Sequence, residues 1–259
     1  MEIPEIDWPV PLKFLDRDGT SLAYRYSSGS HLTVVYTGGF HSNMNGEKAS
    51  SVFMHAREQG FSALCLDYSG HGSSQGVFEE GNISIWLADT LHLVTELTEG
   101  PLVLVGSSMG GWIAQLTALH FTERVKGLVT IAAATDMTEK FIWSKCDDEY
   151  RQKLINDGYF EWDSPYDEDP YIITMQLIDD GRQHLLLGNE IQINCPVRLL
   201  HGTEDGDIDW QNSLATMRKI TSDDVHLKLI KGAGHRLSEP ENIQEILKAL
   251  DEVVKKASI

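Results

Sequence analysis

Short apolar runs alternate with helical patterns along most of this 259-residue chain, and that alternation constrains the fold more than any other feature. The clearest run is Leu102-Val103-Leu104-Val105, which has no polar position and is typical of a strand buried on both faces. Repeated strand and helix units predict parallel strands joined by helical crossovers. We therefore predict an α/β fold, with a mostly parallel central sheet and helices on both of its faces.

The predicted elements follow one another from about residue 12 to a C-terminal helix. A β-hairpin is predicted first, because two β-type runs (12–15 and 21–26) flank the turn dipeptide Asp18-Gly19. The last helix is predicted from one apolar face and from Pro240, which suits a first helical turn. The other predicted strands lie at 32–36, 62–67, 102–105, 127–131, 197–200 and 227–230, and the other helices at 46–60, 83–97 and 109–120.

The interval 135–194 interrupts this alternation. It is rich in acidic and aromatic residues, and the aromatic ones are Phe141, Trp143, Tyr159, Phe160, Trp162, Tyr166 and Tyr171. Connections of this length between two strands are usually functional segments such as lids. We predict a small helical cap at 135–194, inserted between two parts of the core at 1–134 and 195–259. An ordinary crossover with additional helices is the alternative.

A pentapeptide in the middle of the chain, Gly106-Ser107-Ser108-Met109-Gly110, fits the pattern G-x-S-x-G. Three fixed positions match by chance in roughly a tenth of chains of this length, so the setting between a strand and a helix carries the prediction. There the central serine stands on a tight, strained turn. We predict that Ser108 is a nucleophile, because Val105 would occupy the leading glycine position if Ser107 were central.

A serine hydroxyl is a weak nucleophile near neutral pH, so it needs a general base and an acid that orients the base. Where a serine stands on such a turn, the acid and then the histidine follow it in the chain. His235 ends a glycine-rich loop after the last predicted strand and is the predicted base. His201 competes for that role, but it adjoins a strand and we interpret it as structural. For the acid, Asp205 is favoured, with Asp207 second and Glu204 third.

Acyl transfer also needs donors for the oxygen that becomes negatively charged. One donor is predicted to be the backbone N–H of Met109, which follows the nucleophile. The second is predicted to be the N–H of Phe40, because the loop after the strand at 32–36 contains glycines that allow close approach. Gly39, Trp112 and Trp143 are further predicted to line the substrate site.

The net charge argues against one class of partner, and the lack of certain motifs argues against cofactors and metals. A net charge of -18, from 39 acidic and 21 basic residues, repels phosphate backbones, so no nucleic-acid partner is expected. Residues 67–74 are glycine-rich but lack both the dinucleotide pattern and the P-loop lysine, so we interpret them as a structural turn. No histidine and acid spacing resembles a zinc site, and no metal or cofactor is predicted.

The cysteines and the N-terminal residues bear on the compartment. Cys65, Cys146 and Cys195 are odd in number and distant in sequence, which favours a reducing cytoplasm over a disulfide framework. The first ten residues contain acids and two prolines and do not resemble a signal peptide. No apolar run is long enough to span a membrane. A cytoplasmic protein is expected, with the mitochondrial matrix as the alternative if a transit segment has been trimmed.

Several motifs together resemble the family of α/β-hydrolase domain-containing protein 10. The resemblance covers residues 10–255. It is carried by the segments Gly106-Ser107-Ser108-Met109-Gly110-Gly111-Trp112, Asp67-Tyr68-Ser69-Gly70-His71-Gly72-Ser73-Ser74, Asn194-Cys195-Pro196-Val197-Arg198-Leu199-Leu200-His201-Gly202, Met44-Asn45-Gly46-Glu47-Lys48-Ala49 and His235-Arg236. The resemblance implies the α/β-hydrolase fold and a serine hydrolase that is mitochondrial or bacterial.

By this resemblance, Ser108, Asp205 and His235 form a catalytic triad, and the substrates are fatty thioesters, S-acylated proteins or acyl-glucuronide esters. The family's acid motif is His-Gly-x-x-Asp, and Asp205 occupies its aspartate. The chain departs from the family just beyond that residue, where Gly206-Asp207-Ile208-Asp209 replaces the common Asp-Ile-Val-Pro. Both Asp205 and Asp207 therefore stay open as the acid.

The sequence as a whole predicts a serine hydrolase that cleaves carboxylic esters or thioesters through an acyl-enzyme. Its expected partner is a small-molecule ester or thioester, or an acylated protein; its oligomeric state is not predicted. One rival hypothesis is different chemistry on the same residues, such as carbon–carbon bond hydrolysis or perhydrolysis. Another is a catalytically silent binding protein with the same fold.

Overall fold

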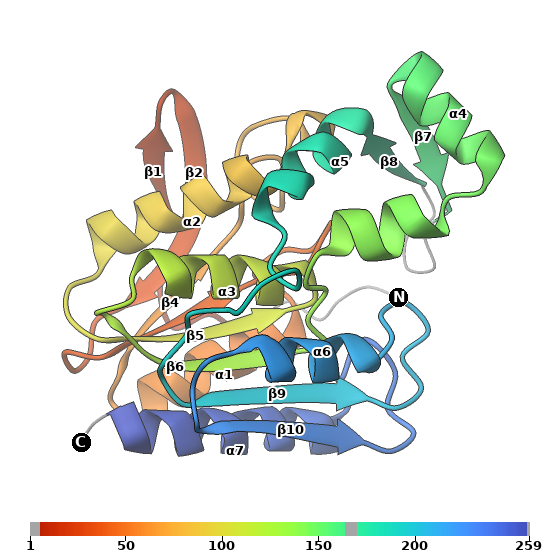
Figure 1. Cartoon of the computed structure of the whole chain (residues 1–259). Helices are drawn as coiled ribbons and strands as arrows, with labels where there is room; N and C mark the ends of the chain where they lie inside the picture. The colour runs from red at the N-terminus through yellow and green to blue at the C-terminus, as the bar shows by residue number, and fades with distance from the viewer. Residues whose placement is uncertain (1–5, 164–169, 258–259) are drawn as a thin grey trace.

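An eight-stranded sheet lies at the centre of the computed structural model, which describes residues 6–163 and 170–257 (Figure 1). Strands β1–β2 and β2–β4 pair antiparallel, and the other pairs are parallel. The strand order is β1-β2-β4-β3-β5-β6-β9-β10, with bounds β1 (Lys13–Arg17), β2 (Thr20–Ser27), β3 (Thr33–Thr37), β4 (Ser62–Leu66), β5 (Leu102–Ser107), β6 (Val125–Ile131), β9 (Val197–Gly202) and β10 (Val225–Ile230). This arrangement confirms the predicted α/β fold class.

The predicted hairpin joins β1 to β2. Asp18 and Gly19 form its turn with φ values of 52° and 88°, and two consecutive positive values are what a type I′ turn requires. Strand β5, whose six residues are all buried, lies between β3 and β6. Because β3, β5, β6, β9 and β10 are parallel, the loops that follow them open at one edge of the sheet.

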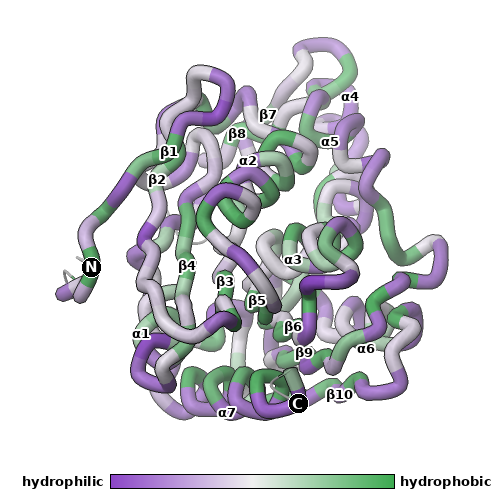
Figure 2. Tube along the Cα trace, turned by 90° about the vertical axis from the view of Figure 1, so that its left-hand side faces the viewer, coloured by the Kyte–Doolittle hydropathy of each residue, from purple (hydrophilic) through white to green (hydrophobic). Residues whose placement is uncertain are grey.

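Two hydrophobic cores lie on opposite faces of the sheet, as the alternation of side chains along β5 requires. Val103 and Val105 belong to the core beneath α1 and α7, whereas Leu102 and Leu104 belong to the core beneath α2 and α3. The helices are α1 (Glu47–Glu58), α2 (Ile83–Leu97), α3 (Met109–His120), α6 (Gln211–Lys219) and α7 (Pro240–Ala257). In Figure 2 the central strands are mainly green and α7 alternates between green and purple, as expected for a helix with one buried face.

The segment predicted as a cap contains short elements of several kinds. They are η2 (Thr138–Ile142), η3 (Trp143–Lys145), α4 (Asp148–Asp157), β7 (Tyr159–Trp162), β8 (Tyr171–Thr174), α5 (Met175–Gly181) and η4 (Arg182–His184). Strands β7 and β8 form a separate antiparallel pair, so this segment is not purely helical as the sequence predicted. Tyr166 lies outside the described residues. The division into core and cap stays a prediction.

Helix α4 shows why the cap elements begin and end where they do. The side chain of Asp147 accepts a hydrogen bond from the N–H of Tyr150 and caps the N-terminus. Gly158 adopts a left-handed conformation, with φ of 84°, and ends the helix before β7. Within the described ranges, no helix is both long enough and apolar enough to cross a membrane.

Candidate active site

Ser108 stands at the turn between β5 and α3, with φ of 55° and ψ of -122°. A positive φ is strained for a residue with a side chain, and here the surrounding packing enforces it. A Cβ atom on Gly106 would clash with the carbonyl of Gly110, and a Cβ on Gly110 would clash with the carbonyl of Thr37. The glycines of the G-x-S-x-G pattern are therefore sterically required.

A hydrogen-bonded chain joins Ser108 to the two loops that follow β10 and β9. Ser108 Oγ lies 3.0 Å from His235 Nε2, and His235 Nδ1 lies 2.8 Å from Asp205 Oδ2. The Asp205 side chain is fully buried, whereas 14% of the His235 side chain is exposed. The structure thus brings the predicted nucleophile, base and favoured acid into direct contact, with the serine end toward solvent.

The carboxylate of Asp205 is hydrogen-bonded through both of its oxygens. Oδ1 accepts the backbone N–H groups of Asp207 and Ile208 at 3.0 and 2.9 Å. Oδ2 faces His235 and also lies 2.9 Å from His201 Nε2. Burial alone would raise the pKa of Asp205, but the hydrogen bonds from His201 and His235 outweigh it and hold the pKa well below its usual range. Asp205 is therefore a permanent negative charge beside His235 near neutral pH.

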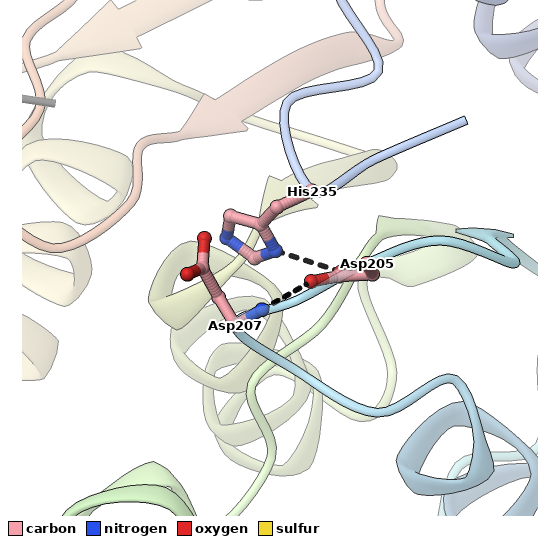
Figure 3. Close-up of side chains that lie close together, drawn as sticks. All are labelled: Asp205, Asp207 and His235. Atoms are coloured by element: carbon pink, nitrogen blue, oxygen red, sulfur yellow. Dashed lines mark hydrogen bonds and ion pairs between the residues drawn. The ribbon is translucent and has the colours of Figure 1, made fainter. Parts of the chain in front are cut away.

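The competing acids, Asp207 and Glu204, lie in the same loop. Figure 3 shows the Asp207 carboxylate beside the ring of His235, while the carboxylate that accepts the hydrogen bond from the imidazole is that of Asp205. Ligand atoms of Asp205, Asp207 and His235 lie within 4.8 Å of one another, a spacing that could hold a cation. Both ring nitrogens of His235 are already engaged by Asp205 and Ser108. Glu204 is exposed, and its backbone N–H donates to the carbonyl of Ala233.

The predicted oxyanion donors flank Ser108. Met109 is the first residue of α3, so its N–H belongs to the helix turn that has no intrahelical acceptor. A Cβ on Gly39 would lie 3.3 Å from the Cβ of Ser108, which places the loop after β3 directly against the serine. Phe40 follows in that loop, and its ring packs against Phe78 at a centroid distance of 4.9 Å. The two N–H groups stay predicted donors.

The loop that carries Phe40 is fixed by side chains from neighbouring elements. Thr37 Oγ1 donates to the carbonyl of Gly110 at 2.8 Å, and Tyr68 Oη donates to the carbonyl of Gly38 at 3.1 Å. Asp67 accepts the N–H groups of Met44 and Ser73, and burial raises its pKa to about 6. The turn at 67–74, which we interpreted as structural, thus supports the loop beside Ser108.

The two tryptophans predicted to line the substrate site have structural contacts. Trp112 is fully buried, and its indole N–H donates to the carbonyl of His184 at 3.1 Å. Trp143 contacts two guanidinium groups, with Arg151 at 5.3 Å and Arg182 at 4.8 Å from its ring centre. These contacts join α3 to the cap segment and brace that segment internally. A role in substrate binding stays a prediction for both, as it does for Gly39.

One contact in the site was missed by the sequence reasoning. His201 was interpreted as structural, but its imidazole binds the same oxygen of Asp205 as His235 does. The four-residue spacing from His201 to Asp205 is the signal that could have indicated this contact. A histidine at the end of a buried strand, followed by a tight loop, can turn back onto the acid of that loop.

The chain is similar to known hydrolases over nearly its whole length. The family described as Serine aminopeptidase, S33 matches residues 28–164. The mitochondrial palmitoyl-protein thioesterase ABHD10 of Homo sapiens is 33% identical over 99% of this chain and 84% of that protein, and the Mus musculus protein is 35% identical over 95% and 84%.

Two solved structures agree with these sequence similarities. A putative hydrolase from Agrobacterium vitis S4 superposes with a TM-score of 0.91 and 34% identity, covering 95% of this chain and 100% of that one. Mouse α/β hydrolase domain-containing protein 10 superposes with a TM-score of 0.88 and 34% identity, covering 95% and 99%.

Proposed function

Since this chain belongs to the α/β-hydrolase family, in the group that includes palmitoyl-protein thioesterase ABHD10, it is a hydrolase, and we propose that it works through a Ser108–His235–Asp205 triad. The observation that carries the proposal is the hydrogen-bonded chain from Ser108 Oγ to Asp205 Oδ2. Each member has the contact that its role needs, and the serine has the strained backbone of a nucleophile elbow.

In the proposed mechanism, Ser108 Oγ attacks the carbonyl carbon of an ester or thioester while its proton passes to His235 Nε2. The negative oxygen is held by the N–H groups of Met109 and Phe40. When the tetrahedral intermediate collapses, the leaving alcohol or thiol takes the proton from His235 and an acyl-enzyme remains on Ser108. Water then attacks the acyl carbon, with His235 as base, and releases the carboxylic acid.

The contribution of Asp205 is electrostatic and geometric. Its buried negative charge stabilises the imidazolium that forms on His235, and its hydrogen bond to Nδ1 keeps Nε2 directed at Ser108. Because the pKa of Asp205 is depressed, the proton stays on His235 rather than moving to the carboxylate. This reasoning favours Asp205 over Asp207 as the acid.

For the substrate we propose fatty-acyl thioesters, including S-acylated protein, ahead of acyl glucuronides. The support is that the mitochondrial relatives are named palmitoyl-protein thioesterases. The apolar residues that the cap segment contributes to the core, among them Phe141, Phe160 and Ile173, are compatible with an apolar acyl group nearby. Rates across acetyl, octanoyl and palmitoyl thioesters test this point, and a preference for acetyl would reject a long acyl chain. The cytoplasmic and mitochondrial locations both stay predictions.

A fluorophosphonate probe tests the proposed nucleophile. The wild-type protein should be labelled and should turn over p-nitrophenyl butyrate, and Ser108→Ala should do neither. Ser107→Ala is the matched control, because Ser107 adjoins the nucleophile but ends strand β5. Equal labelling of wild type and Ser108→Ala would remove Ser108 from the mechanism. A wild type that neither labels nor turns over ester would favour the silent binding protein.

A further inference from the structure

The hydrogen-bonded chain does not end at Asp205 but continues inward through His201 to Ser213 on α6. His201 Nε2 lies 2.9 Å from Asp205 Oδ2 and 2.9 Å from the carbonyl oxygen of Ile208. His201 Nδ1 lies 2.7 Å from Ser213 Oγ. The side chains of His201 and Asp205 are fully buried, and so is Ser213. These contacts form a second, solvent-excluded histidine site behind the acid.

We propose that His201, set by Ser213, is a positioning residue that holds the Asp205 carboxylate in the orientation that His235 requires. The inference rests on the proposed triad and adds the residues that contact Asp205 from behind. It assigns to the histidine of the His-Gly-x-x-Asp segment a role in catalysis that acts through Asp205.

The contacts define which nitrogen of His201 carries the proton. The carbonyl oxygen of Ile208 can only accept, so Nε2 is a donor. Within residues 6–163 and 170–257, His201 Nδ1 is the hydrogen-bond partner found for Ser213 Oγ, so the buried hydroxyl proton needs Nδ1 as its acceptor. His201 is therefore a neutral imidazole protonated at Nε2. A neutral donor orients Asp205 without competing as a second cation for its charge.

The position of His201 explains how it could control the acid loop. Its single N–H is shared by the Asp205 side chain and the carbonyl oxygen of Ile208. The buried ring therefore joins the first and the last residue of the loop 205–208. The backbone N–H groups of Asp207 and Ile208 hold the other carboxylate oxygen. Without His201, the one partner left to Oδ2 among the described residues is His235, and the carboxylate can rotate away from the geometry that directs His235 Nε2 at Ser108.

Two substitutions separate positioning from simple core filling. His201→Leu fills much of the same volume but removes the donor, whereas His201→Gln can place an amide N–H near the position of Nε2. We expect His201→Leu to lower kcat for p-nitrophenyl butyrate by about a hundredfold, the loss typical of small misplacements in an active site, with KM little changed. His201→Gln should restore most of the lost kcat. Thermal unfolding of each variant reports whether it is folded at the assay temperature.

A nuclear magnetic resonance measurement reads the same contacts without turnover. In protein labelled with ¹⁵N-histidine, His201 should show the pattern of a neutral ring protonated at Nε2. The proton between His235 Nδ1 and Asp205 should be shifted far downfield in the wild type and should weaken or move in His201→Leu. Ser213→Ala removes the hydroxyl that sets the ring and should lower kcat several-fold, less than His201→Leu does.

The outcomes distinguish this inference from the proposed function. A folded His201→Leu variant with wild-type kcat and an unchanged downfield proton would overturn it, as would His201 protonated at Nδ1. If His201→Leu does not fold, His201→Gln and Ser213→Ala decide: wild-type kcat in Ser213→Ala together with an unchanged His201 tautomer contradicts the inference. If the wild type lacks esterase activity, the proposed function fails while the tautomer measurement still decides the role of His201.

Discussion

Helices α3 and α4 are of similar length but are held in opposite ways. Every residue of α3 from 109 to 118 is buried, whereas α4 buries only Leu154. The first helix carries the turn with Ser108, and the second lies in the segment predicted as a cap. The comparison indicates that the proposed chemistry rests on a fully packed frame around α3, whereas exposed residues of α4 can change with less cost to the fold.

The loops that carry Asp205 and His235 are also attached differently from the cap segment. The loops with Asp205 and His235 follow neighbouring parallel strands, and their backbones are joined where Glu204 donates to Ala233. The cap segment adds apolar side chains such as Phe141 and Leu177 to the core, and separate polar contacts also fasten it. They include Lys140 with Asn212, Ser84 with His184, and Lys145 with the carbonyl of Asp207. Substitutions in the frame should therefore abolish turnover, and those in the cap should shift substrate preference.

The largest effect is expected at the acid. Asp205→Asn should lower kcat by about 10⁴-fold, because an amide cannot hold His235 in the required tautomer and charge state. Asp207→Asn is the matched control two residues away and should change kcat far less. Steady-state kinetics with p-nitrophenyl butyrate measure both. A larger loss in Asp207→Asn than in Asp205→Asn would exchange the roles of the two acids.

Adding one methyl group to a glycine should destabilise the protein in the loop after β9 but not in the cap segment. A Cβ on Gly202 would clash with the carbonyl of Ala233, so Gly202→Ala should cost about 1–3 kcal/mol of unfolding free energy. Gly188→Ala in the cap segment meets no heavy atom within 4 Å and should be nearly neutral. Urea unfolding of the two variants tests this contrast, and equal stabilities would show that the loop after β9 can relax.

The pH dependence of stability should contain opposite contributions from Asp67 and Asp205. Burial raises the pKa of Asp67 to about 6, so between about pH 4 and 6 the folded state binds the proton more tightly than the unfolded state. Stability from this group therefore falls as pH rises through that window. The pKa of Asp205 is lower in the folded state than in the unfolded state. Its contribution to the free energy of unfolding is therefore fully present above the pKa of the unfolded state and is lost as the pH falls below that value.

Asp67→Asn should remove the decline between about pH 4 and 6 relative to wild type. Unfolding free energies at several pH values measure the difference. A decline of the same size in the variant would mean that other carboxyl groups cause it. Asp16→Asn, an exchange at an exposed site near the β1–β2 turn, is a suitable control.

The smallest effect on chemistry is expected in the cap segment. Trp143→Ala removes the ring that both Arg151 and Arg182 contact, so it should loosen the cap and raise KM for long-chain thioesters several-fold. The kcat for p-nitrophenyl butyrate should change less than that KM does. A loss of kcat comparable to that of Asp205→Asn would contradict the separation between frame and cap.

The sequence predictions were more accurate for the strands and turns of the core than for the cap segment. The buried strand β5, the hairpin at Asp18-Gly19 and the glycines around Ser108 follow from local patterns, and the structure has all three. Local sequence could not resolve Asp205 from Asp207, because that choice depends on where a loop from a distant strand places His235. The pairing of β7 with β8 was also missed, since short strands in a variable connection lack a strong periodic signal.

The contact between His201 and Asp205 is another feature that local sequence could not predict. Its spacing was visible in the sequence, but the tight loop that turns the ring toward the acid depends on Ile208 and on helix α6. The structure supplies a tertiary partner, Ser213, that no local pattern indicates.

The most direct test of the account is to capture the acyl-enzyme. The protein is mixed with p-nitrophenyl butyrate, quenched in acid during turnover and digested, and the peptides are analysed by mass spectrometry. We predict a butyryl group on the peptide that contains Ser108, located at Ser108 by fragmentation and missing from Ser108→Ala. A butyryl group on another residue, or p-nitrophenol release by Ser108→Ala at the wild-type rate, would contradict the account.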